Sequence, residues 1–272
     1  MRLTEYEKQA QRDIDRWQHG EASFLQQAID FAMKPVDWAF DRVVPPELVD
    51  RLSDAIVEGL GVLNDASEWT YEEDDVLEKA RTHELDVDSV DDLRDKPLER
   101  LDPIAREFYN QNAILAAIEG GGTSLGGPLF IAADIPLLFT INFRLIQQIG
   151  GAYGFPLRRP EFKSLVIAIY NVAASGSQQA KNDAMRELSV AAAAFAHDTE
   201  YRGRRASGTF RDQNRHVPRE LAKNLAARKL GQLIPITGAA IGAGVNYWFT
   251  DQTAKTATML FRALYLERKE RL

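Results

Sequence analysis

A serine inside a glycine-rich run is the first place where this chain could do chemistry. Gly122-Thr123-Ser124-Leu125-Gly126 has the G-x-S-x-G spacing of a nucleophilic serine held at a sharp turn between a strand and a helix. The preceding residues, Ala113–Ile118, have the composition of a helix rather than a strand, and Pro128 follows closely. The context therefore favours a close-packed turn. A hydrolase that uses Ser124 stays the alternative interpretation.

His197 and Asp198 are adjacent, as in some metal-dependent hydrolases. The chain has four histidines and no cysteine, which excludes disulfides, thiolate zinc sites and cysteine nucleophiles. A metal site at His197 would need further ligands such as His216 and Asp212. His197 also closes an alanine-rich segment, and a helix C-terminus favours a protonated histidine. We predict no metal and no cofactor, with His197 as a weak candidate for the alternative hydrolase.

Three polar residues lie in apolar surroundings. Asp134 is the only charged residue between Gly120 and Phe143, and a buried carboxylate without a partner is costly. We expect Asp134 to be the N-cap of a helix that begins at Leu137. The alternative is a buried ion pair or polar site with Arg144 or another base. Asn142 and Asn246 are expected to bond to backbone groups freed by nearby prolines and glycines.

Two glycine pairs have the spacing that allows close helix packing. Gly122/Gly126 and Gly238/Gly242 each place two missing side chains on one helix face, so that another backbone can approach. The segment Leu230–Thr250 has 21 residues without a charge, long enough to span a bilayer. Its glycines and Pro235 dilute the hydrophobicity, so a buried helical hairpin is favoured over a membrane span.

The elements that position these residues are predicted to be helices. Thr4 and Glu7 form a capping-box pattern that opens a helix to about His19. Asp102 and Pro103 resemble an N-cap and first residue of a later helix. Apolar residues recur at helical spacing, and no β-branched run alternates. Helices are expected over 24–43, 47–63, 104–119, 137–152, 161–175, 178–197, 218–230 and 251–270.

The predicted fold is all-α, a compact multi-helix bundle with the glycine-rich apolar segments packed in its core. We expect one domain over residues 1–272. Residues 65–107 contain sixteen acids and six bases. The 65–100 part is expected to be a loop-rich, peripheral acidic insert.

A basic stretch precedes the second apolar segment. Residues 202–229 contain nine bases and two acids, while the whole chain has a net charge of −7. Nucleic acid is therefore not an expected partner. Basic residues beside an apolar segment suit an anionic membrane surface, or they pair with the acidic stretch of the same chain. The predicted membrane-surface residues are Arg202, Arg204, Arg205, Arg211 and Arg215.

Taken together, the two apolar segments and their surroundings resemble the EcsC protein family. The resemblance rests on Ala116–Gly120 with the glycine run, Asp134-Ile135-Pro136, Asn142, Tyr153-Gly154, Ile234-Pro235-Ile236, Gly238–Asn246, Tyr6-Glu7 and Trp17. It implies a largely helical protein with a role beside a membrane transport protein, and it supplies no catalytic residue.

The resulting prediction is a non-enzymatic, membrane-proximal accessory protein. It is expected to bind lipid or a membrane transport partner through the glycine-rich segments. The first twenty residues are charged and lack the apolar region of a signal peptide. A cytoplasmic location is expected, at the inner face of the membrane where the protein meets lipid.

Overall fold

The computed structural model describes most of the two ends and the middle of the chain. The described residues are 3–20, 47, 54, 72–123, 128–155, 157, 163–175, 181–183, 185–186 and 238–271. Within them every regular element is helical and none is a strand, which confirms the all-α fold. The elements are α1 (Glu5–His19), α4 (Glu73–Thr82), the 3-10 helix η2 (Val90–Asp95), α5 (Leu98–Thr123), α6 (Pro128–Ala152), α7 (Lys163–Ser175) and α10 (Gly238–Arg271).

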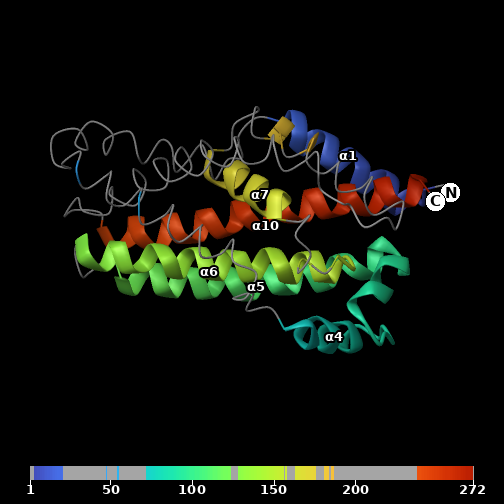
Figure 1. The fold of residues 1–272 in the computed structure, drawn as a ribbon, viewed down its shortest axis with the longest axis horizontal. Coiled ribbons are helices and arrows are strands. Elements are labelled where there is room, and N and C mark those ends of the chain that lie inside the picture. Colours follow the sequence, from blue (N-terminus) through green and yellow to red (C-terminus); the bar gives the residue numbers. More distant parts are fainter. Residues whose placement is uncertain are drawn as a thin grey trace, which may run out of the picture.

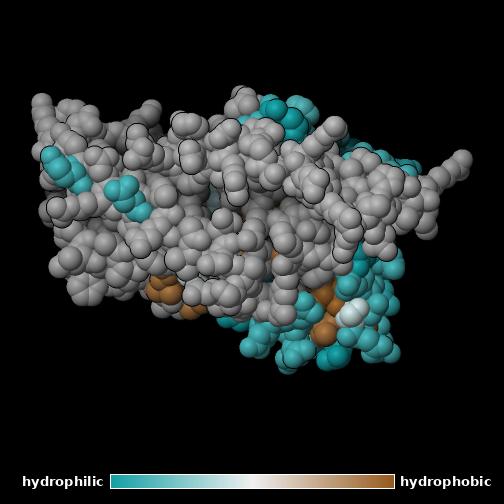
Figure 2. Space-filling model, in the orientation of Figure 1, coloured by the Kyte–Doolittle hydropathy of each residue, from teal (hydrophilic) through white to brown (hydrophobic). Residues whose placement is uncertain are grey.

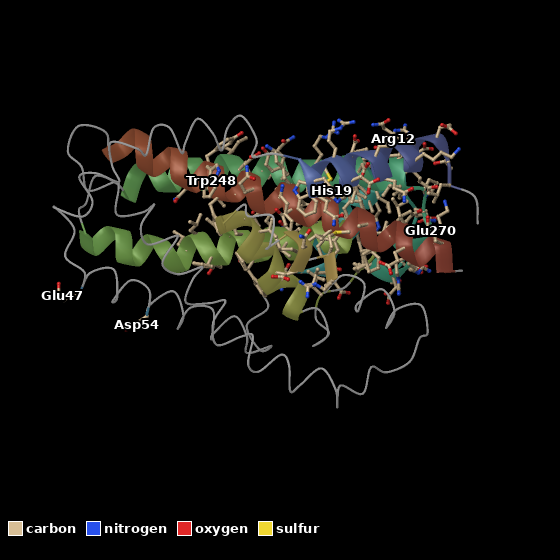
Figure 3. All side chains as sticks on the ribbon, turned by 90° about the horizontal axis from the view of Figure 1, so that it is seen from above. Arg12, His19, Glu47, Asp54, Trp248 and Glu270 are labelled. Carbon is tan, nitrogen blue, oxygen red and sulfur yellow. The ribbon has the colours of Figure 1, made fainter. Side chains whose placement is uncertain are left out.

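Three long helices, α5, α6 and α10, lie side by side and form the body of the bundle (Figure 1). The chain runs out along α5 and returns along α6, and α10 runs in the same direction as α6. Helices α1 and α7 pack on α10, while α4 packs on α5 and α6 at the other side. In Figure 3, α1 lies along the part of α10 that carries Glu270, and Trp248 marks its other part.

The first helix begins where its capping signal predicts. The Thr4 hydroxyl accepts a hydrogen bond from the Glu7 amide at 3.2 Å, and the Glu7 carboxylate accepts one from the Thr4 amide at 2.8 Å. These reciprocal bonds satisfy two amide groups that a helix start leaves unpaired. Ala10 and Ile14 follow on the buried face and join the core.

One hydrophobic cluster joins all the described helices. Aromatic rings from three helices meet in it: Phe139 lies 5.2 Å from Tyr170 and 6.1 Å from Phe249, measured between ring centroids. Further along α10, the Phe261 ring stacks on Phe155 at 6.1 Å. Aromatic pairs at such separations stabilise a core beyond the area that they bury.

Three predicted helix starts are wrong, because each helix begins earlier. The helix expected from 104 starts at Leu98, so Asp102 and Pro103 lie inside α5 and are not its N-cap and first residue. Leu98 and Leu101 are buried in the core, and their burial outweighs the single backbone hydrogen bond that Pro103 removes. The helix expected from 251 begins at Gly238 and continues to Arg271. The predicted hairpin over Leu230–Thr250 has no turn between 238 and 250, and its first part, 230–237, lies outside the described residues.

The helix expected from 137 starts at Pro128. Asp134 therefore lies within α6, and its predicted role as N-cap of a helix beginning at Leu137 is wrong. Proline is favourable in the first turn of a helix, and Pro128 is the first residue of α6.

The described part of the acidic stretch is folded into the bundle. Instead of loops, residues 72–100 contain α4, η2 and the start of α5. Their apolar side chains, Val76, Ala80, Leu85, Val87, Val90 and Leu93, are buried in the common cluster. Gly154 shows how closely η2 approaches α6: its φ is +80°, and an added Cβ would lie 2.4 Å from the Arg94 backbone nitrogen. Only glycine fits such a position.

The remaining predicted helices fall largely outside the described residues. This holds for 24–43, 47–63 and 218–230, apart from residues 47 and 54, which are helical. In the range 178–197, residues 181–183 and 185–186 are helical. The helix predicted over 161–175 is confirmed as α7.

Candidate functional site

The glycine-rich ends of three helices gather at one end of the bundle. We call this the apolar end and define it as Ala113–Thr123 of α5, Pro128–Phe143 of α6 and Gly238–Thr250 of α10. Glu119 and Asp134 are the only charged residues in these ranges. In Figure 1 the three ranges meet at the left, opposite the labelled N- and C-termini. The sequence predicted such segments but not that they lie together.

Large hydrophobic side chains are exposed at the apolar end. Among the described residues five such side chains are exposed, and four of them lie there: Ile114 (62%), Leu115 (43%), Leu137 (41%) and Tyr247 (38%). Figure 2 shows a hydrophobic patch at the lower left edge of the bundle, while the surface over α4 is mostly hydrophilic with hydrophobic patches within it. Clustered exposed apolar residues typically mark a contact site for a protein or a membrane.

Three predicted glycines and Asp134 are placed at the apolar end only by their backbone. Gly122 lies in the last turn of α5, Gly238 and Gly242 in the first turns of α10, and Asp134 within α6. Gly126 lies outside the described residues. The close packing predicted for the glycines stays a prediction.

Arg144 is not the ion-pair partner that the sequence suggested for Asp134. Its guanidinium donates to Asp75 of α4 at 3.0 Å. Ten residues of helix separate Asp134 from Arg144, about 15 Å along the axis. The Arg144–Asp75 ion pair instead attaches α6 to α4.

Polar residues line the packed faces where the apolar end joins the rest of the bundle. Asn142 is fully buried, and its amide nitrogen donates to the Leu138 carbonyl at 2.8 Å and to the Thr250 hydroxyl at 3.2 Å. The bond to Leu138 reaches a backbone carbonyl one turn earlier in α6, which is not a group freed by a proline or glycine, while the bond to Thr250 joins α6 to α10. Asn246 is buried as well.

Some polar atoms in this region have no partner within the described structure. They are the Asn142 carbonyl oxygen, both amide atoms of Gln147 and the Thr253 hydroxyl. Buried polar groups in native proteins are nearly always paired, by water where the protein offers nothing. Asn142 and Gln147 of α6 and Thr253 of α10 therefore bury polar atoms that the described part of the chain does not satisfy.

The buried carboxylate of Asp251 joins α10 to α5. Asp251 accepts a hydrogen bond from the Tyr109 hydroxyl at 2.7 Å and pairs with Lys255 at 2.8 Å. The pKa of Tyr109 lies above its ordinary value, chiefly because the phenol is buried and further because it is hydrogen-bonded to Tyr247 and Asp251. Tyr109 is thus a neutral donor at physiological pH, and the arrangement positions helices rather than supplying a base.

At the other end of the bundle, the carboxylate of Asp102 is the centre of a buried hydrogen-bond cluster, called here the Asp102 cluster. This carboxylate accepts two hydrogen bonds from Arg262, at 2.9 and 2.7 Å, one from Tyr153 at 2.7 Å and one from Tyr6 at 2.5 Å. The Asp102 side chain is 3% exposed and that of Arg262 13%. Burial and the bond to Asp102 raise the pKa of Tyr6 to about 12. With every acceptor position used, Asp102 links α5 to α1, to the turn that follows α6 and to α10, and it has no lone pair left for catalysis.

Sequence reasoning missed this Asp102 cluster, although one signal was present. Arg262 is the only charged residue between Thr256 and Leu266 in an otherwise apolar run. A lone arginine there implies a buried acid partner. Which acid could not be read from the sequence, because Asp102 is 160 residues away.

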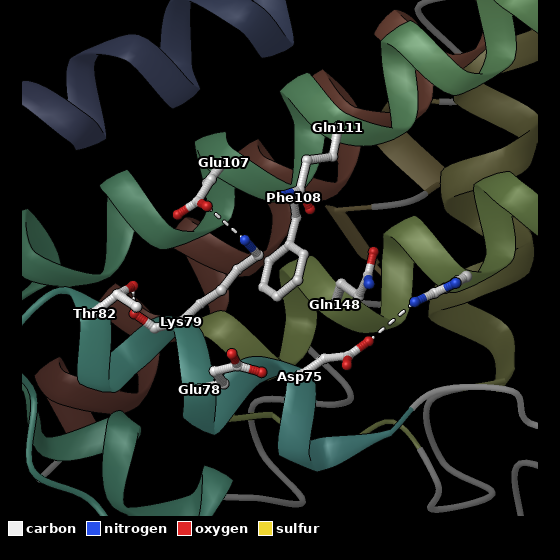
Figure 4. Close-up of a pocket in the computed structure, with 9 residues that line it drawn as sticks. Asp75, Glu78, Lys79, Thr82, Glu107, Phe108, Gln111 and Gln148 are labelled. Carbon is white, nitrogen blue, oxygen red and sulfur yellow. Dashed lines mark hydrogen bonds and ion pairs between the residues drawn. The ribbon is translucent and has the colours of Figure 1, made fainter.

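A pocket of about 430 Å³ lies between α4, α5 and α6 (Figure 4). On α4, Asp75, Glu78 and Lys79 face it, spaced three and four residues apart as one helix face requires. On α5, Glu107 accepts from Lys79 at 2.5 Å, and this bond holds the pKa of Glu107 below its ordinary value of 4.5. Arg144 and Gln148 of α6 complete the lining.

The remaining predicted functional residues fall outside the described parts of the chain. These are Ser124, His197 and the five arginines 202, 204, 205, 211 and 215. Within the described residues, no group of three or more metal-ligating side chains is present. No helix in those same ranges is both long and apolar enough to cross a membrane.

Comparison with known proteins assigns the family. The sequence profile described as the EcsC protein family matches residues 8–266. The chain belongs to the EcsC protein family. It is 27% identical over 153 residues to Protein EcsC of Bacillus subtilis (strain 168), covering 56% of this chain and 58% of that protein. It is 21% identical over 257 residues to Uncharacterized protein YdbA of the same strain, covering 92% of this chain and 89% of that protein.

No solved structure matches the chain. The family match begins within α1 and ends within α10, so Asp102 with Tyr153 and Arg262, the pocket and the apolar end lie within the EcsC region, while Tyr6 precedes it.

Proposed function

We propose that this EcsC-family protein is a non-enzymatic accessory protein that works at a membrane surface. It binds lipid or a membrane transport partner through the apolar end. The observation that carries the proposal is the exposure of Ile114, Leu115, Leu137 and Tyr247 at the end of the bundle that has almost no charge.

Two features of the chain support a membrane over a soluble partner. The apolar end includes part of the longest uncharged stretch of the sequence, and nine bases precede that stretch between Arg202 and Lys229. Apolar side chains entering the interface and bases facing anionic headgroups attract a protein to the same surface. Each base near such a surface contributes on the order of 1 kcal/mol, and salt screens that attraction.

The test is flotation of the purified protein with vesicles of defined composition. Binding is expected to vesicles that contain anionic phosphatidylglycerol, to be weaker to pure phosphatidylcholine, and to fall as salt rises. Replacing Arg204, Arg205, Arg211 and Arg215 together with Gln should remove the salt-dependent part. Absence of binding to anionic vesicles at low salt would refute the membrane role.

The apolar contribution is tested separately on α5. Ile114→Ser with Leu115→Ser removes two exposed apolar side chains, each worth at least about 1.5 kcal/mol if it is buried in lipid. Vesicle affinity should then fall about 100-fold. The matched control is Asn110→Ser, an exposed position one turn earlier on the same helix, which should bind as the wild type does.

A further inference from the structure

We propose that the pocket between α4, α5 and α6 binds a small zwitterion with one ammonium and one carboxylate group, of the α-amino acid type. The proposal does not depend on the membrane role, because the pocket lies beside α4 and uses none of the exposed residues of the apolar end.

Gln148 supplies the observation that points to a ligand. Its side chain faces the pocket, yet the residue is only 4% exposed. The amide oxygen accepts from Asn112 at 3.0 Å, which leaves the amide nitrogen without a partner among the described residues. In Figure 4 the Gln148 side chain lies beside the Phe108 ring in the pocket lining. This amide nitrogen is available to donate a hydrogen bond to an acceptor bound in the pocket.

Two cations beside Gln148 have hydrogen-bond donors to spare. Lys79 gives one of its three donors to Glu107, and Arg144 gives one nitrogen to Asp75. Only 16% of the Lys79 side chain is exposed, so its ammonium is held in place rather than moving freely in solvent. Lys79, Arg144 and the Gln148 amide together offer donors from two opposite walls, which is the arrangement that a carboxylate needs.

Acceptors for an ammonium group come from α4. Glu78 is exposed and has no ion pair in the described part of the chain, and Asp75 uses one carboxylate oxygen for Arg144. The two acids are three residues apart and lie on the same helix face. An ammonium between them would gain charge-assisted hydrogen bonds to both.

The charge of the lining favours a zwitterion over a free anion. Three carboxylates, on Asp75, Glu78 and Glu107, face two cations, on Lys79 and Arg144. A free anion would add to this excess of negative charge and compete with two existing ion pairs, whereas a zwitterion adds no net charge. The volume of about 430 Å³ lies within the range of small-molecule sites.

The first experiment compares three probes of matched shape. L-leucine carries both charged groups, isoamylamine lacks the carboxylate, and 4-methylpentanoate lacks the amine. We expect saturable binding of leucine in isothermal titration calorimetry, and binding at least tenfold weaker for each analogue. Absence of leucine binding up to about 10 mM, or equal binding of leucine and either analogue, would overturn the proposal.

The second experiment places that binding in the pocket. Glu78→Gln removes an exposed charge without a described partner, and Gln148→Glu keeps an acceptor for Asn112 while replacing the amide donor with an oxygen. Each should weaken leucine binding at least tenfold. The control Glu99→Gln makes the same change as Glu78→Gln on α5, away from the pocket lining, and should bind normally. If Glu78→Gln binds leucine as the control does, the proposed site is wrong, whatever the folding of Gln148→Glu.

Discussion

Removing the Asp102 carboxylate should destabilise the protein more than any change to an exposed ion pair. In Asp102→Ala, Arg262 loses both of its bonds to the carboxylate while its side chain stays 13% exposed, and the Tyr6 and Tyr153 hydroxyls lose their acceptor. Breaking a buried ion pair by removing one partner costs about 3–5 kcal/mol, chiefly because the remaining charge stays buried.

The assay is thermal unfolding followed by circular dichroism. For a chain of this size, about 1 kcal/mol corresponds to a change in Tm of about 2–4 °C. Asp102→Ala is therefore expected to lower Tm by about 6–20 °C. Asp75→Ala is the matched control, because it removes the same group from an ion pair whose side chains are 48% and 36% exposed. Exposed pairs contribute about 0–1 kcal/mol.

A double-mutant cycle separates the ion pair from the two phenol bonds. Asp102→Ala combined with Arg262→Ala should cost clearly less than the sum of the single changes, since the double variant buries no unpaired charge. Tyr6→Phe should cost about 1 kcal/mol and should increase hydrogen exchange mainly in α1. A decrease in Tm for Asp102→Ala no larger than that for Asp75→Ala would refute the proposed stabilising role of the Asp102 cluster.

Three further predictions test other parts of the fold. Gln147→Met removes two buried polar atoms that have no partner among the described residues. It should raise the free energy of unfolding, measured in urea, by about 1–3 kcal/mol; a decrease would show that the amide is satisfied by water or by another part of the chain. The Lys79 hydrogen bond holds the pKa of Glu107 below 4.5, so the ionised Glu107 should stabilise the protein fully above about pH 4.5 and lose this effect as pH falls through the lowered folded-state pKa. The decrease in Tm on acidification should therefore be smaller in Glu107→Gln than in the wild type. Identical profiles of Tm against pH for the two proteins would contradict this. Gly154→Ala should cost about 2 kcal/mol or more, since its φ is +80° and a Cβ would meet the Arg94 backbone; an unchanged urea midpoint would mean that η2 does not pack there.

Local signals in the sequence were reliable where a few neighbouring residues decide the structure. The Thr4–Glu7 capping box marked the start of α1 correctly, because both partners lie within one turn. The 161–175 prediction for α7 was close for a similar reason, since apolar periodicity defines that helix. The family assignment held because its motifs, though chemically unspecific, extend over most of the chain.

Signals failed where distant packing outweighs local preference. Asp102-Pro103 has the composition of a helix start, but burial of Leu98 and Leu101 extends α5 by one and a half turns before it. The acidic composition of residues 72–100 suggested a solvated insert. Val76, Ala80 and Leu93 are nevertheless buried, so a few well-spaced apolar residues are enough to pack this segment onto the core. The pocket depends on contacts between α4, α5 and α6, so no local pattern could have predicted it.

The buried polar pairs explain how helices rich in small residues keep one alignment. Small residues leave smooth helix faces, and apolar contacts alone would permit neighbouring helices to slide past one another. Sliding by one turn, about 5.4 Å, would separate Asn142 from Thr250, Tyr109 from Asp251 and Asn112 from Gln148 at once. Each separation would leave buried groups unpaired at about 1–3 kcal/mol each. These three contacts join each pair among α5, α6 and α10, so the register of all three helices is fixed from inside the bundle. The exposed apolar residues are then free to serve a partner or a membrane, because the alignment of the helices does not depend on them.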